Sequence, residues 1–157
     1  MGARIQAMLR QLRRFSDRHR HAHGPFAHLF MPYEGSDVIA IDCETTGLDS
    51  RHAELVSIAA VPVKQGRVLT SQALDIKLEA PEGESVVATL EQLLEFIGNR
   101  PLVGWCVDFD VAMVNRYLRP LMGFDLPNTT IELSSLYQKK MRHWKPELEP
   151  DLHFDAM

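Results

Sequence analysis

Residues 38–48 read VIAIDCETTGL, an apolar run that ends in two carboxylates. The β-branched and apolar residues of the run predict a central strand of a sheet. Side chains two residues apart on a strand point to the same face, so Asp42 and Glu44 should project together while Cys43 points into the packing. Two neighbouring carboxylates are costly unless a positive charge lies between them. The stretch therefore predicts a divalent-cation site at the strand end, the alternative being two acids that merely enter a loop.

The residues that follow alternate between strand and helix patterns. The predicted elements are strands at 55–63 and 68–78 joined by a hairpin turn at 64–67, a helix at 86–97, a strand at 102–105, a helix at 108–118, a strand at 129–133 and a helix at 134–141. Asp108 is expected to cap its helix and Pro120 to stop it. Three meandering strands followed by strand–helix alternation predict an α/β fold, a mixed five-stranded sheet with flanking helices.

A third carboxylate, Asp110, falls in the first turn of the helix that starts near residue 108. The helix dipole favours an acid there, so this position alone does not require a metal. Asp110 nevertheless heads an apolar stripe, and a charged residue that faces a core usually has a partner there. The preceding Trp105 is expected to pack inside the protein, the alternative being a stacking surface for a nucleic-acid base.

Together these segments resemble the DEDD family of 3′–5′ exonucleases, the DnaQ-like group that includes proofreading subunits of replicative DNA polymerases, such as the DNA polymerase III epsilon subunit. Residues 41–49 match the first motif of that family, and residues 102–110 match the second. The resemblance covers roughly residues 37–141 and implies an RNase H-like fold. It also implies two Mg²⁺ or Mn²⁺ ions held by the catalytic carboxylates, and main-chain contacts with the terminal nucleotide. The implied metal ligands are Asp42, Glu44 and Asp110, and the implied nucleotide-binding residues are Cys43, Thr45, Thr46, Gly47 and Phe109.

The resemblance implies a two-metal hydrolysis that releases nucleoside 5′-monophosphates from 3′ ends, in proofreading or repair. The expected partners are a single-stranded 3′ end, DNA rather than RNA, and a polymerase or another replication or repair protein, with no membrane. Two alternatives stay open. One is a non-catalytic nuclease-fold module that binds nucleic acid or a polymerase, and the other is an exoribonuclease that acts on short RNA.

The chain departs from the family pattern in three places. Trp105 and Cys106 stand where the family usually has His-Asn, and only residues 79–85 join the third strand to the next helix, so that loop is either naturally short or missing residues. The third motif, H-x-A-x-x-D or a Tyr-based equivalent, is not found, because His153 has Asp155 only two residues later. A general base contributes about 10²–10⁴-fold. We expect a C-terminally incomplete domain whose His and Asp lie beyond residue 157, and a chain with little activity without them.

The charge divides the chain into two parts. The net charge is −4, yet residues 1–30 hold six arginines and one acid, a net +5 against −9 for the remainder. Residues 3–20 predict an amphipathic helix with an Arg-rich outer face, either a solvated packing helix or an arm that binds phosphate or a partner. We expect residues 1–32 to form this helix and a linker, and residues 33–157 to form the RNase H-like domain. The alternating histidines of the linker are a weak candidate for binding a metal.

Two further features concern the location of the protein. No apolar run approaches the ~20 residues that span a bilayer, and the basic N-terminus lacks the pattern of a secretory signal. The only cysteines, Cys43 and Cys106, are expected to be buried and reduced, which favours the cytoplasm.

Overall fold

A mixed sheet forms the centre of the computed structural model, which describes residues 2–78 and 84–142. The strands are β1 (Val38–Thr45), β2 (Leu55–Lys64), β3 (Arg67–Val68), β4 (Leu74–Lys77), β5 (Leu102–Gly104) and β6 (Thr130–Glu132). Their order is β3-β2-β1-β5-β6, with β4 also paired to β2. β1 is antiparallel to β2 and parallel to β5, and β5 is parallel to β6. The predicted mixed sheet is therefore confirmed, with β1 at its centre.

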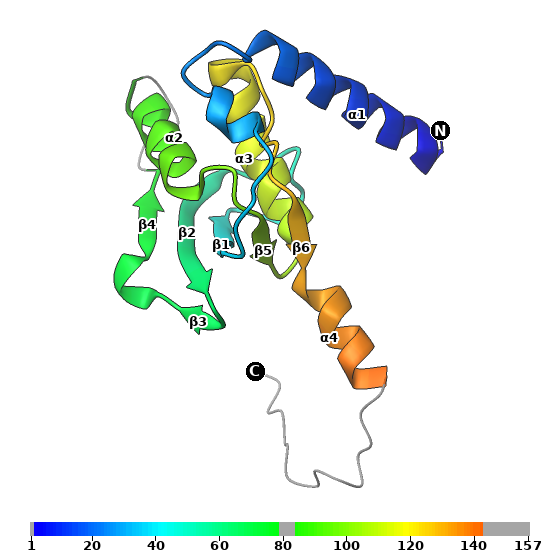
Figure 1. Cartoon of the computed structure of the whole chain (residues 1–157), viewed down its shortest axis with the longest axis vertical. Coiled ribbons are helices and arrows are strands. Elements are labelled where there is room, and N and C mark those ends of the chain that lie inside the picture. Colours follow the sequence, from blue (N-terminus) through cyan, green and yellow to red (C-terminus); the bar gives the residue numbers. More distant parts are fainter. Residues whose placement is uncertain (1, 79–83, 143–157) are drawn as a thin grey trace, which may run out of the picture.

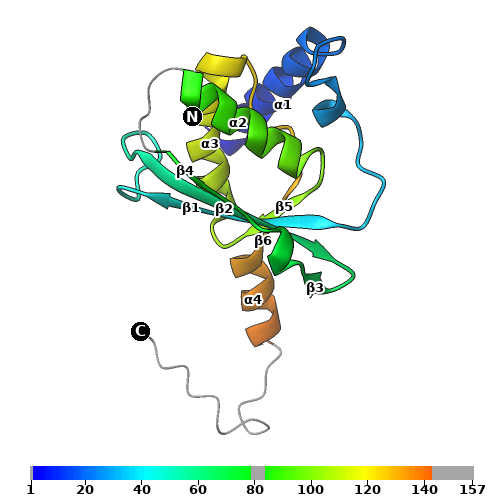
Figure 2. The same cartoon turned by 90° about the vertical axis from the view of Figure 1, so that its left-hand side faces the viewer.

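Helices cover the sheet unequally. They are α1 (Ala3–Arg20), α2 (Glu84–Ile97), α3 (Val107–Met122) and α4 (Leu133–Arg142), with 3-10 turns η1 (Ala27–Phe30) and η2 (Thr70–Gln72). In Figure 1, α2 and α3 lie over the sheet while α1 extends to one side. Figure 2 views the sheet nearly edge-on, with α1, α2 and α3 on one side and α4 on the other. The face opposite α2 and α3 is thus left largely open.

The core lies between the sheet and the helices α2 and α3. Ile39 and Ile41 point from β1 into it, and the predicted apolar residues of α2 are all buried (Val86, Leu90, Leu93, Leu94 and Ile97). Because side chains alternate along a strand, Ala40 and Asp42 lie on the opposite face. This alternation directs the acids of β1 away from the core.

One predicted strand is divided in two. The segment expected at 68–78 is interrupted by η2, so five predicted strands become six. The three residues of η2 are Thr, Ser and Gln, none of which supplies an apolar side chain for a sheet face. The hairpin turn before β3 is confirmed, since Gln65 and Gly66 both have the positive φ angles of a two-residue hairpin loop.

The predicted limits of α3 are wrong at both ends. Its N-cap is Cys106, with φ 55°, and Asp108 lies inside the first turn. Pro120 is accommodated in the last turn, and the helix ends at Gly123, whose φ of 84° suits a left-handed C-cap. A proline near a helix end disturbs few hydrogen bonds, so it does not stop the helix at once.

The N-terminal segment packs on the rest of the chain. Leu29 is buried in the core, and His21 contacts Phe124 edge-to-face at 4.9 Å between ring centroids. The apolar side of α1, expected to pack inward, faces solvent, while the buried Asp17 on the other side pairs with Arg119 of α3. The division at residue 32 stays a prediction.

Several expectations lie outside the described residues. They concern the third-motif search around His153 and Asp155, and most of the connection at 79–85. Within residues 2–78 and 84–142, no helix is both long and apolar enough to cross a membrane.

Candidate active site

The C-terminal end of β1 presents Asp42 and Glu44 on the open face of the sheet. Both side chains are exposed, while the intervening Cys43 is half-buried on the helix side. The pairing with β2 shifts register between Glu44 and Thr45, the kind of irregularity that turns a strand out of its ladder. The two acids therefore stand where β1 leaves the sheet.

Asp110 approaches the same strand from the helix side. The side chain is 3% exposed, and its Oδ1 accepts a hydrogen bond from the backbone N–H of Cys43 at 3.3 Å. Its second oxygen, Oδ2, is buried without a hydrogen-bond partner among the described residues. Burial, together with the charge of Asp42, raises the pKa of Asp110 to about 6. A buried acceptor without a partner costs free energy, and a bound cation would relieve that cost.

Asp110 bonds to the backbone of Cys43, the residue between Asp42 and Glu44, but the three acids do not form a closed cage. Within the described part of the chain, no three His, Cys, Asp or Glu side chains form a group that could hold a metal. The donor set suits a hard divalent cation, since all three predicted ligands offer carboxylate oxygens. Their role as ligands stays a prediction.

Glu132, at the end of β6, holds the N-terminus of α3 and was not anticipated from the sequence. Its Oε1 and Oε2 accept the backbone N–H groups of Cys106 and Val107 at 2.8 and 2.9 Å. Desolvation works against ionisation, but these bonds and those from Ser134 lower the pKa of Glu132 overall. The carboxylate takes the place of a cap on the first turn, the turn that also carries Asp110.

We expect Glu132→Ala to lower the free energy of unfolding, because the two N–H groups lose their acceptor. Urea denaturation followed by circular dichroism measures the change. Glu91→Ala, an exposed acid on α2, is the matched control and should change little. Equal stability of the two variants would contradict the capping role.

The loop after β1 is braced by its own hydrogen bonds. Thr45 Oγ1 donates to Gly47 O at 2.7 Å, and Thr46 Oγ1 accepts the N–H of Glu54 at 2.8 Å. From α3, Arg116 donates to Ser50 O at 3.0 Å, and Tyr117 Oη accepts the N–H of Leu55 at 3.2 Å. Both threonine hydroxyls thus serve the loop, and the N–H of Thr46 donates to Glu54 O at 2.9 Å. The nucleotide contacts of these residues stay a prediction.

The remaining predicted nucleotide-binding residues lie on the helix side. Phe109 and Cys43 are partly buried against the core. Burial, with the nearby Asp110 and Asp42 carboxylates, raises the pKa of the Cys43 thiol well above its usual range, so the sulfur stays protonated. The expected burial of Cys106 is wrong, since it is exposed as the N-cap of α3.

Trp105 is exposed, which corrects the expected packing role. Its side chain is 57% exposed and meets the ring of Tyr137 from α4 at 5.8 Å between centroids. It lines a groove of about 560 Å³ on the open face of the sheet, together with Asp42 and apolar residues of β1 and β2. β5 ends at Gly104, so Trp105 lies just beyond the strand and its side chain does not enter the core.

Gly104 allows β5 to lie close to β1 beside the acids. A Cβ at this position would stand 2.8 Å from the carbonyl oxygen of Ile41, a backbone atom that cannot rotate away. Asp42 is the next residue, so any shift of this carbonyl moves the site.

We therefore expect Gly104→Ala to lower the free energy of unfolding by about 1–3 kcal/mol. Chemical denaturation measures it, and Gly24→Ala is the control because a Cβ there would meet only an ordinary contact at 3.7 Å. Unchanged stability of Gly104→Ala would show that the space between β5 and β1 can accommodate a Cβ.

Comparison with known proteins finds sequence similarity to exonucleases. Residues 39–79 match the RNase T family model, described as "Exonuclease". The chain is 25% identical over 131 residues to a PolC-type DNA polymerase III of Thermotoga petrophila, with 71% of the chain covered. It is 26% identical over 121 residues to the DNA polymerase III subunit epsilon of Aquifex aeolicus, with 64% covered. The chain is related to the DnaQ-like exonucleases. The matched residues include Asp42 and Glu44 of the DnaQ-like first motif.

Solved structures share the DnaQ-like fold. An E. coli exonuclease I complex with single-stranded DNA superposes with a TM-score of 0.55 over 75% of this chain, at 14% identity. The chain spans 31% of that protein and 58% of the Aquifex epsilon subunit. It spans only 10% of the Thermotoga polymerase.

Proposed function

We propose that the chain is a metal-dependent 3′–5′ exonuclease that removes nucleoside 5′-monophosphates from single-stranded 3′ ends of DNA. The observation that carries the proposal is the buried Asp110 Oδ2, an acceptor without a partner beside the strand that ends in Asp42 and Glu44. A cation bound beside β1 would satisfy this acceptor. The relationship to DnaQ-like exonucleases supports the same chemistry.

One group of residues would bind the metal ions, and another would position the 3′ end of the substrate. Asp42, Glu44 and Asp110 would hold two Mg²⁺ or Mn²⁺ ions, which activate water and offset charge at phosphorus when bound. The hydrogen bond from Cys43 N–H fixes the Asp110 carboxylate against β1, and Glu132 fixes the helix that carries it. The braced loop at Thr45 and Thr46 would position main-chain groups against the terminal nucleotide.

The groove beside Asp42 supports a nucleic-acid substrate. The exposed Trp105 offers a flat surface at the edge of that groove, and stacking of one base on an aromatic side chain contributes about 1–3 kcal/mol. The acidic net charge of residues 31–157 disfavours a long electrostatic contact with a duplex. Binding of only a few unpaired nucleotides is consistent with both the exposed Trp105 and the acidic net charge.

We expect Trp105→Ala to raise KM for a single-stranded oligonucleotide about fivefold to a hundredfold with a smaller change in kcat, because stacking binds substrate away from the reacting phosphate. Steady-state kinetics separate the two constants. Tyr137→Phe keeps the neighbouring ring and is the control. An unchanged KM for the Trp105→Ala protein would show that no base stacks in this part of the groove.

The direct test is incubation of the full-length protein with Mn²⁺ and a single-stranded oligonucleotide labelled at its 3′ terminal nucleotide. The expected product is labelled mononucleotide, without internal fragments. Competition between matched DNA and RNA oligonucleotides separates the proposed substrate from the exoribonuclease alternative, because the two differ at the sugar 2′ position.

A non-catalytic binding module is the second candidate function. The lack of a metal-holding cluster among the described residues favours it. Such a module would bind the oligonucleotide or a polymerase without releasing nucleotides and without taking up Mn²⁺. Binding of Mn²⁺ without hydrolysis would support the proposed metal site but contradict the proposed exonuclease reaction.

A further inference from the structure

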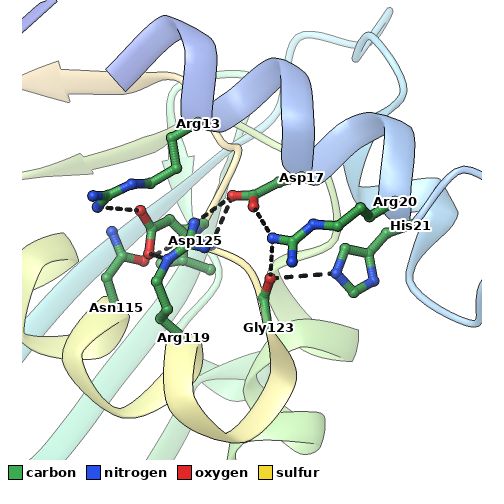
Figure 3. Close-up of polar contacts among 9 residues, drawn as sticks. Arg13, Asp17, Arg20, His21, Asn115, Arg119, Gly123 and Asp125 are labelled. Atoms are coloured by element: carbon green, nitrogen blue, oxygen red, sulfur yellow. Dashed lines mark hydrogen bonds and ion pairs between the residues drawn. The ribbon is translucent and has the colours of Figure 1, made fainter. Parts of the chain in front are cut away.

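The polar side of α1 is fixed to the body of the protein by a buried carboxylate (Figure 3). Asp17 is 1% exposed, and its Oδ2 receives Nη2 of Arg119 at 2.6 Å and the backbone N–H of Asp125 at 3.3 Å. Arg20 donates to the Asp17 Oδ1 at 2.9 Å and to the carbonyl of Gly123 at 3.1 Å. These bonds join the last turns of α1 to the C-terminal end of α3.

The opposite side of α1 is an exposed apolar stripe. Its spacing of i, i+3, i+4, i+7 and i+10 places its members on one face, a half-turn away from Asp17. The stripe consists of Ile5, Met8, Leu9, Leu12 and Phe15, which are 43%, 54%, 53%, 58% and 71% exposed. A contiguous apolar surface of this kind usually marks an interaction site.

The ion pairs explain why the stripe does not turn inward. Rotating α1 by half a turn would cover the apolar side chains, but it would separate Asp17 from Arg119. Breaking a buried ion pair is strongly unfavourable, since a charge is left without a partner. The ion pairs with α3 thus fix the orientation of α1 and leave its apolar face exposed to solvent.

Charge at the border of the stripe indicates what would cover it. Arg4 precedes Ile5 and Arg18 lies one turn after Phe15, and neither forms an ion pair with an acid among the described residues. A second copy of α1 would bring arginines against arginines. An anionic bilayer would attract α1 but repel the remainder of the chain, whose net charge is −9. Nucleic acid would make no use of the apolar side chains.

We propose that α1 is a docking helix whose stripe inserts into an apolar groove, edged by carboxylates, on another protein. The stripe matches the anchor spacing of helix-in-groove recognition, and Arg4 and Arg18 would meet the acidic edge. Docking of α1 does not depend on the proposed exonuclease activity, because the stripe lies on the side of α1 opposite Asp17, which pairs with Arg119 of α3.

The probe is a designed two-helix hairpin with a leucine-lined groove edged by glutamates, compared with the same hairpin edged by lysines. Calorimetry with the whole chain should give at least about tenfold tighter binding to the glutamate-edged hairpin. Leu9→Ser/Leu12→Ser should weaken that binding at least about tenfold by removing two buried anchors. Gln6→Ser/Gln11→Ser alters the same helix outside the stripe and should bind like the unsubstituted chain.

Three outcomes would overturn the proposal. The first is equal binding of the two hairpins, or binding that Leu9→Ser/Leu12→Ser does not change while circular dichroism shows an intact helix. The second is no binding to either hairpin together with stripe-dependent binding to vesicles of equal parts phosphatidylcholine and phosphatidylglycerol, which would assign the stripe to a membrane. The third is a dimer in sedimentation that the leucine substitutions dissociate, which would assign it to a second copy.

Discussion

Asp42→Asn should reduce the Mn²⁺-dependent release of mononucleotides by about 10³-fold or more. Asp42 lies on the open face of β1, and its charge contributes to the raised pKa of Asp110. Replacing a carboxylate ligand with an amide weakens cation binding and removes several kcal/mol of charge stabilisation at phosphorus. Release from a 3′-labelled single strand by the full-length protein, measured at saturating Mn²⁺, gives the ratio of rates.

Asp37→Asn is the matched control, because it removes an acid just before the other end of the same strand. Its rate should stay within about threefold of the unsubstituted chain, in line with a neutral surface change. Comparable losses in Asp37→Asn and Asp42→Asn would point to a general charge effect. Full activity in Asp42→Asn would show that the acids of β1 are not the site.

Asp110→Asn should make the metal-free protein more stable at pH 7 by about 1–3 kcal/mol, while weakening its binding of Mn²⁺. Burial and Asp42 raise the pKa of Asp110 to about 6, so the ionised form is disfavoured in the fold. An asparagine keeps the oxygen that accepts from Cys43 N–H and removes the buried charge. A stability gain coupled to lost cation binding is typical of a strained functional group.

The pH dependence of stability has a definite sign. The folded pKa of about 6 lies above the ordinary 3.8, so the folded state binds this proton more tightly than the unfolded state. The cost of ionising Asp110 is absent below pH 4 and fully present above about pH 7, so it grows as the pH rises through 6. Urea denaturation in EDTA should therefore show the difference between Asp110→Asn and the unsubstituted chain increasing from pH 4 to 7. A difference that is constant with pH would contradict the shift.

Most of the framework of the site could be predicted from short sequence patterns. The run at 38–44 determines a strand whose alternation separates Ile39 and Ile41 from Asp42. The stripe headed by Asp110 is confirmed, because Met113, Val114 and Leu118 are buried on the same side of α3. Periodicity succeeds here because each element buries one face against the same core.

Features that depend on contacts between distant segments could not be predicted in this way. The cap on α3 comes from Glu132, twenty-five residues beyond Val107, so the local pattern favoured Asp108 instead. Trp105 is a large aromatic residue beside a buried strand, yet β5 ends one residue earlier and leaves it exposed. The orientation of α1 depends on Arg119 and Asp125, which amphipathicity alone cannot reveal.

The central claim is that the acids at the end of β1 and Asp110 form one cation site, and Mn²⁺ titration followed by electron paramagnetic resonance tests it most directly. The loss of free Mn²⁺ signal reports binding whether or not the reaction proceeds. We expect the chain to bind Mn²⁺, and Glu44→Gln and Asp110→Asn each to weaken binding at least about tenfold. No uptake of Mn²⁺, or the same affinity in both variants and the unsubstituted chain, would contradict the assignment.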